Sequence, residues 1–166
     1  EWEKEEHKKK NKKDQNGLNN SLKKAEALIK DAHKKEDYWG DRSSYIQYLR
    51  ASALLHDFLR VDVPIADQSQ ALYLLGLSYE AIAELLGGQE SNEYYYKACI
   101  RRSPHTQIAL NCYRRLEAVL NVDYLAPSGN IEIPRMALDQ LRELRNMAQP
   151  IQLNSNSEGR GTFDRQ

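Results

Sequence analysis

The 166-residue chain lacks long apolar runs and net charge, and it contains only five prolines and eight glycines. No run of about 18 apolar residues is present, so no segment is expected to span a bilayer as a helix, and no signal-peptide pattern is visible. Because 24 basic residues balance 24 acidic ones, overall charge gives no reason to expect nucleic acid or an anionic membrane as partner. A soluble domain is expected. Its compartment stays open, since a chain that begins at Glu1 without Met suggests a processed protein or part of a longer or exported one.

Cysteine is also scarce, with only Cys99 and Cys112 in the chain. Their spacing matches neither a CxxC motif nor a zinc-ligand set. Each cysteine follows the apolar pattern of its predicted helix, so buried free thiols are expected. A disulfide between neighbouring helices is the alternative, for a protein that works outside the cytoplasm.

The residue patterns of catalytic sites are missing as well. An enzyme would need a nucleophile with a base, a metal constellation or a phosphate cradle, and none is visible. His7, His33, His56 and His105 lie in different segments and form no HxxxH or HExxH pair. Asp57 follows His56 directly, but adjacent helical residues point in different directions, so a structural histidine is expected. The sequence therefore predicts a protein that is not an enzyme, with no cofactor and no metal site.

What the chain does contain is helix-forming composition, with abundant Leu, Ala, Glu, Lys, Gln and Arg and little Val or Thr. Apolar residues recur at helical spacing in six segments, separated by turns. These segments are roughly residues 19–35, 44–60, 68–86, 91–102, 105–120 and 134–148. Glycines at Gly87 and Gly88 suit the C-terminal end of the third segment. Pro104 is expected near the first turn of the fifth.

The domain organisation follows from these segments. One all-α domain is predicted over residues 18–148, with a charged tail at 1–17 and a flexible polar tail at 149–166. The lysine-rich run from Lys8 to Lys13 is expected to be a solvated or frayed helical end, and a polybasic patch for lipid or RNA is the alternative. The segment 121–135 is the longest inner loop, in which Ile131 and Ile133 alternate as if pinned against the protein.

A motif runs through the stretch "ALYLLGLSYEAIAELLGGQESNEYYYKACIRRSP", from Ala71 to Pro104. Leu72, Leu75, Gly76 and Tyr79 have the spacing W-x2-L-G-x2-Y, with Leu in place of Trp, and the stretch resembles the tetratricopeptide repeat (TPR). The second half of the motif falls on Ser91, Tyr95, Ala98 and Pro104. The spacing between the two halves is about three residues longer than in the family, and the hairpins before and after this unit lack the signature.

This resemblance implies a right-handed stack of about three antiparallel helical hairpins, and an unrelated all-helical bundle is the alternative. In the family, the first helix of each pair lines a concave groove that holds a peptide or helix of a partner protein. The positions that this implies for the groove are Gln70, Tyr73, Leu77, Glu80, Asn111 and Arg115. Asn111 and Arg115 are four residues apart and could together bind a carboxylate. Tyr73 and Leu77 stand where the carboxylate-clamp members carry Lys and Asn, so a clamp for chaperone C-termini is not expected.

The predicted function is therefore a non-enzymatic interaction module, a scaffold or adaptor for another protein. The alternative is a nucleic-acid or anionic-surface binder that uses the Lys-rich tail and a basic patch. The residues of that patch are Lys97, Arg101, Arg102 and Arg114. A regulatory or assembly subunit of a larger complex is a third reading. The apolar last helix, with Leu138, Leu141 and Leu144, is expected either to pack into the core or to form a homo-oligomer contact.

Overall fold

The computed structural model describes residues 2–35, 43–86, 90–126, 129 and 131–151, with the backbone alone at 2–16, 18–19, 84–86 and 90–91. This part of the chain contains six α-helices. They are α1 (Trp2–Lys35), α2 (Tyr45–Leu59), α3 (Ile65–Leu86), α4 (Glu90–Arg102), α5 (Gln107–Asp123) and α6 (Arg135–Ala148). Gly87, Gly88 and most of the expected C-terminal tail, residues 152–166, lie outside the described residues.

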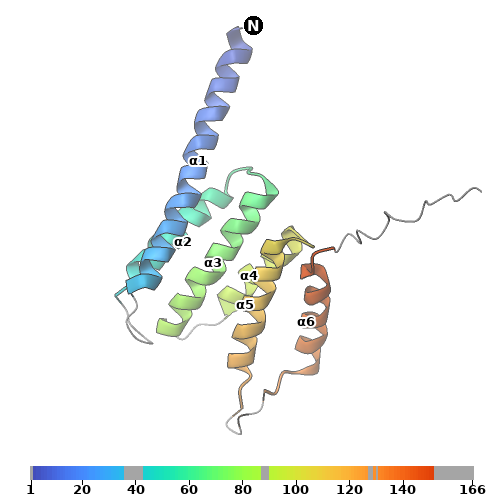
Figure 1. The fold of residues 1–166 in the computed structure, drawn as a ribbon. Coiled ribbons are helices and arrows are strands. Elements are labelled where there is room, and N and C mark those ends of the chain that lie inside the picture. The colour runs from blue at the N-terminus through green and yellow to red at the C-terminus, as the bar shows by residue number, and fades with distance from the viewer. Residues whose placement is uncertain (1, 36–42, 87–89, 127–128, 130, 152–166) are drawn as a thin grey trace, which may run out of the picture.

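The helices pack in sequence order, each against the next, and this confirms the all-α fold class. Contacts also join α1 to α3, α3 to α5 and α4 to α6. Figure 1 shows α1, α3 and α5 running in one direction while α2, α4 and α6 run in the opposite direction, with α6 at the end of the row. The chain therefore forms a row of antiparallel pairs, in which the first helices of successive pairs lie side by side.

Helix α1 begins at Trp2, well before the start near residue 19 that the apolar pattern predicts. Its first half projects past the other helices (Figure 1). A helical segment with no neighbour to pack against needs no apolar stripe, so the apolar pattern did not reveal it. Glu and Lys are good helix formers, and the spacing of Glu5 to Lys9 and of Glu6 to Lys10 favours a helix without any core contact. Consistent with a mid-helix position, the Ser21 hydroxyl donates to the carbonyl of Gly17, at 3.2 Å.

The buried side chains form two clusters rather than one. The first joins α1, α2 and α3, because each of these helices carries an apolar stripe that only its neighbours can cover. Its largest fully buried side chains are Leu55, Phe58 and Leu75. The second cluster joins α4, α5 and α6 around Tyr96, Leu116 and Leu144. Helix α3 lies between the clusters and also turns Leu72 and Tyr73 toward the second.

Gly76 marks the joint between the two clusters. A Cβ atom at this position would lie 2.6 Å from Cδ1 and 2.8 Å from Cζ of the Tyr96 ring, distances that real side chains do not adopt. Tyr96 itself is completely buried. The glycine thus allows α3 to approach the Tyr96 ring of α4 closely.

A disulfide joins Cys99 of α4 to Cys112 of α5, with their Cα atoms 6.4 Å apart. The expectation of free thiols is therefore wrong. Both cysteines are completely buried, as their apolar spacing indicates. The tight turn between α4 and α5 brings the two cysteines face to face, within the distance that a disulfide requires. The apolar spacing along a single helix could not show this.

The turn between α4 and α5 is fixed at both of its ends. Thr106 is the N-cap of α5, and its hydroxyl accepts a hydrogen bond from the amide of Ala109. His105 has a φ of 61°, unusual for a residue with a side chain, and its amide donates to the carbonyl of Met147 at 2.7 Å. Pro104 thus precedes the helix instead of lying in its first turn. The whole turn is tied to the end of α6.

The connection from α5 to α6 contains an isolated antiparallel bridge between Leu125 and Ile131. The amide of Glu132 donates to the carbonyl of Tyr124 at 2.9 Å. Ile133 is half-buried against the second cluster, while Ile131 is exposed. The expectation that both isoleucines are pinned against the protein therefore holds for Ile133 and not for Ile131.

Candidate partner-binding groove

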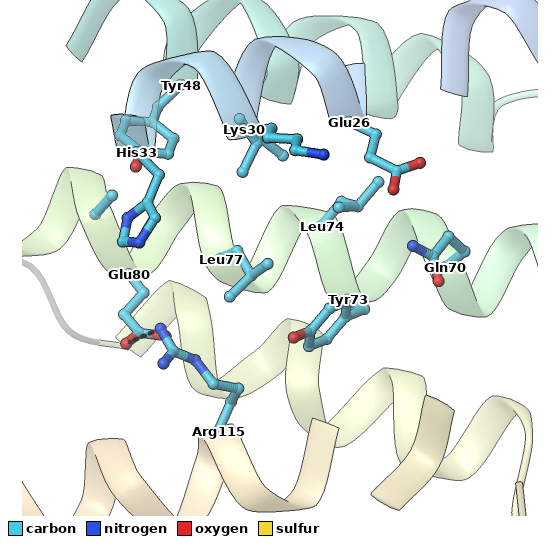
Figure 2. A pocket seen from close by; sticks show the side chains of 12 residues that line it. Glu26, Lys30, His33, Tyr48, Gln70, Tyr73, Leu74, Leu77, Glu80 and Arg115 are labelled. Atoms are coloured by element: carbon cyan, nitrogen blue, oxygen red, sulfur yellow. Dashed lines mark hydrogen bonds and ion pairs between the residues drawn. The ribbon is translucent and has the colours of Figure 1, made fainter. Parts of the chain in front are cut away.

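A groove with a volume of about 500 Å³ opens between α1, α3 and α5. Helix α3 supplies its floor, α1 forms one wall, and Arg115 of α5 closes the other side (Figure 2). The lining residues are Glu26, Ile29, Lys30, His33, Tyr48, Gln70, Tyr73, Leu74, Leu77, Glu80, Ala81 and Arg115.

The floor of the groove is largely apolar and its edges are polar. Tyr73, Leu77 and Ala81 are spaced four residues apart on α3, so they follow one face of the helix and remain half-buried. Across from them, Figure 2 shows the side chains of Lys30 and His33 directed from α1 over this floor. A ligand in the groove would meet apolar contact below and hydrogen-bonding groups at the sides.

A three-residue polar network closes one end of the groove. The hydroxyl of Tyr96 donates to Oε2 of Glu80 at 2.5 Å, and the guanidinium of Arg115 donates to Oε1 of the same carboxylate at 2.8 Å. Burial raises the pKa of the Tyr96 hydroxyl well above its usual value, and the Glu80 charge raises it further. Partial burial lowers the pKa of Arg115, but Glu80 and Tyr96 outweigh that effect and raise it overall. The network holds Glu80 and Arg115 in fixed positions at the groove.

Five of the six residues that the TPR resemblance assigns to a groove line this one, namely Gln70, Tyr73, Leu77, Glu80 and Arg115. Asn111 does not line it, and its side-chain oxygen instead accepts a hydrogen bond from Gln107 at 3.1 Å. Arg115 donates to Glu80 within the groove wall, and the binding of a partner carboxylate by Asn111 and Arg115 together stays a prediction.

Sequence reasoning did not identify the residues of α1. Glu26, Lys30 and His33 recur at four- and three-residue spacing and so share one face of the helix. Helix α1 carries no repeat signature, so no register pointed to these positions. The available signal was the row of polar residues that runs directly beside the buried Ala25, Ile29 and Ala32 in the helix pattern.

The four residues of the predicted basic patch differ in their contacts, since two are paired with other side chains and two are exposed. Lys97 forms an ion pair with Glu93 at 2.6 Å, and Arg102 donates to the side chain of Gln68 at 2.6 Å. Arg101 and Arg114 are exposed, on α4 and α5 respectively. Binding of nucleic acid through these side chains stays a prediction, and a steep loss of affinity with added salt would be its signature.

A separate aromatic cluster lies where α2, α3 and α4 meet. Nε2 of His56 lies 3.1 Å from the Tyr79 hydroxyl and 3.4 Å from that of Tyr95, and the two tyrosine rings are stacked. Asp57 instead pairs with Arg60 at the surface. Of the three consecutive tyrosines, Tyr96 is buried, Tyr95 half-buried and Tyr94 exposed, as their fan around a helix predicts. The His56 ring therefore packs against two tyrosine rings and lies within hydrogen-bonding distance of both hydroxyl groups.

Across the described ranges, no helix has the length and apolar character needed to cross a membrane. No group of three or more His, Cys, Asp or Glu side chains among the described residues is arranged to hold a metal ion. The chain matches no protein-family model, no curated protein sequence and no solved structure.

Proposed function

We propose that the chain is a non-enzymatic interaction module, which holds a segment of another protein in the groove between α1, α3 and α5. This proposal depends on one observation: the positions that the repeat motif assigns to a groove lie on a single surface groove of the structure. Gln70, Tyr73, Leu77, Glu80 and Arg115 follow from the TPR resemblance, and all five line the same groove. The common direction of α1, α3 and α5 is what a TPR-like stack would produce (Figure 1), and we include that architecture in the proposal.

The chemistry of the groove suits a short stretch of polypeptide. Binding sites of this size combine an apolar surface with a few fixed polar groups. Here Tyr73 and Leu77 would supply the apolar contact, while Gln70 and Lys30 supply hydrogen-bonding groups along the edges. Glu80 and Arg115 are already held in place by each other and by Tyr96, so little side-chain freedom would be lost there on binding.

Selection from a library of short random peptides tests the proposal. We expect wild-type protein to enrich a shared sequence pattern with an apolar anchor. Because truncation of buried anchors costs the most in an interface, the double variant Tyr73→Ala with Leu77→Ala should weaken binding of the enriched peptides by about tenfold or more. Titration calorimetry or fluorescence polarisation measures the effect.

The matched control is Ile46→Ala with Leu49→Ala, a double truncation of two exposed side chains of α2 that do not line the groove. It should bind the peptides as wild type does. Equal affinity of wild type and the groove variant would overturn the proposal, as would equal losses in the groove and control variants. Far-UV circular dichroism of both variants checks that each remains folded.

A further inference from the structure

Helix α1 brings two charged side chains to the groove that pair with no described residue. Glu26 and Lys30 both line the groove, and both are exposed. They lie four residues apart, in the order that favours an ion pair along a helix. In the structure, however, neither forms an ion pair or a hydrogen bond within the described part of the chain. Both charges are therefore available to a molecule that enters the groove.

The other two formal charges at the groove are already paired. Both oxygens of Glu80 accept hydrogen bonds, one from Tyr96 and one from Arg115. In the ion pair between Glu80 and Arg115, Nη2 lies 2.8 Å from Oε1. Two opposite charges in direct contact largely cancel for a ligand that lies farther away. Selection of a ligand by its charge therefore depends on the α1 wall.

The charge on the α1 wall changes sign along the groove. Figure 2 shows Glu26 and Gln70 toward one end of the groove, and His33 and Glu80 toward the other, with Lys30 between them. A chain that lies along α3 would therefore pass a carboxylate first and an ammonium group next, or the reverse if it runs the other way. A ligand with charges of one sign would meet one attraction and one repulsion on this wall.

The spacing of the two charges suits an extended peptide. Four residues along a helix span about 6 Å, and side chains on one side of an extended peptide are two residues, or about 6.7 Å, apart. Two such side chains can thus lie opposite Glu26 and Lys30 at once. The side chain between them points the other way, toward Tyr73, which packs against the second cluster and lies on the α5 side of the floor (Figure 2).

We propose that the groove selects an extended segment of a partner protein in which an apolar residue stands between one basic and one acidic residue. The basic side chain lies opposite Glu26 and the acidic one opposite Lys30, while the apolar side chain contacts Tyr73 and Leu77. Glu26 and Lys30 are then the residues that determine specificity. Either order of the two charges fits, because the segment can enter in either chain direction. This inference rests on the proposed function and adds the class of segment that the groove takes.

Fluorescence polarisation with four labelled synthetic peptides tests the inference, at a low salt concentration of about 50 mM. The peptides share the flanking sequence enriched by the selection and differ at their centre, which is Arg-Leu-Asp, Asp-Leu-Asp, Arg-Leu-Arg or Gln-Leu-Gln. We expect the wild type to bind Arg-Leu-Asp about threefold or more tighter than either like-charged peptide. Glu26→Lys should shift the preference to Asp-Leu-Asp, and Lys30→Glu should shift it to Arg-Leu-Arg.

Two matched controls reverse exposed charges outside the groove. Lys23→Glu lies on the same helix as Lys30, and Glu143→Lys lies on α6; neither position lines the groove. Both controls should keep the wild-type order of the four peptides. Since Glu26 and Lys30 have no described partner to lose, their variants should also keep the helical circular dichroism signal of the wild type.

The outcomes separate this inference from the proposed function. If the wild type binds all four peptides equally, and the Tyr73→Ala with Leu77→Ala variant still loses them, the inference is overturned while the proposed function stands. If the wild type enriches and binds no peptide, both are overturned. A preference for Arg-Leu-Asp that neither charge reversal changes, or that the controls change equally, also overturns the roles given to Glu26 and Lys30.

Discussion

At Gly76 the close contact between α3 and α4 depends on the absence of a side chain. Gly76→Ala would bring a methyl group against the buried ring of Tyr96. Alanine is the better helix former by up to about 1 kcal/mol, but overpacking of this kind typically costs about 1–3 kcal/mol. We expect a net loss in the free energy of unfolding, measured by urea denaturation.

Gly17 provides the control for that experiment. It also lies within a helix, and a Cβ added there would meet nothing within 4 Å. Gly17→Ala should therefore leave stability unchanged or raise it slightly. A Gly76→Ala protein as stable as the wild type would show that the Tyr96 ring can move aside, contrary to its complete burial.

Some of these residues could be predicted from the sequence and others could not. Gly76 could be identified as a motif position because the motif depends on local spacing alone. The bond between Glu80 and Arg115 joins residues 35 positions apart, and no local pattern carries that information. The groove positions were predictable from the register on α3, while those of α1 were not, because no repeat motif sets a register there.

At the scale of elements, the disulfide joins α4 and α5 across a short turn. Replacing both Cys99 and Cys112 with Ala should lower the free energy of unfolding by about 3 kcal/mol, since the crosslink restricts the unfolded chain. Urea denaturation of oxidised wild type and double variant measures this difference.

Alkylation provides the direct check. In denaturant without reductant, iodoacetamide should modify neither cysteine, and mass spectrometry should show both modified once a reductant is added. Modification of both thiols in unreduced, denatured protein would contradict the crosslink. Since both cysteines are buried in the folded protein, the denaturant is needed in both arms.

The helices themselves were largely predictable, because buried stripes at helical spacing mark five of the six to within a few residues. The start of α1 was not, because its first half has no core to face and depends on helix propensity alone. The disulfide was only the alternative expectation and the turn at His105 was not predicted, because both depend on how two elements meet rather than on either one. The tie from His105 to Met147 joins residues 42 positions apart.

At the scale of the whole molecule, tyrosine burial predicts a loss of stability in alkali. Burial raises the pKa of Tyr95 and of Tyr113 from 10.0 to about 12, and that of Tyr96 further. These tyrosines hold their protons more tightly in the folded protein, so the unfolded chain ionises first. The free energy of unfolding should be constant below about pH 10 and fall above it, by up to about 1.4 kcal/mol per pH unit for a fully buried group such as Tyr96.

Urea denaturation at a series of pH values measures this curve. Tyr96→Phe removes one ionisable group and should make the decline above pH 10 less steep, although the variant also loses a hydrogen bond to Glu80 and should be less stable at neutral pH. Curves of equal slope for the two proteins would count against a buried, proton-retaining Tyr96.

The division of the interior into two clusters has a consequence for cooperativity. Units with separate cores can open separately, and the cluster of α1 to α3 has no crosslink comparable to the disulfide of α4 and α5. The groove takes Lys30 from the first unit and Arg115 from the second. A ligand that touches both walls would bind only when both units are folded, and so would couple their unfolding. Hydrogen exchange should then show α1 and α5 protected together in the complex, where the free protein protects them to different degrees.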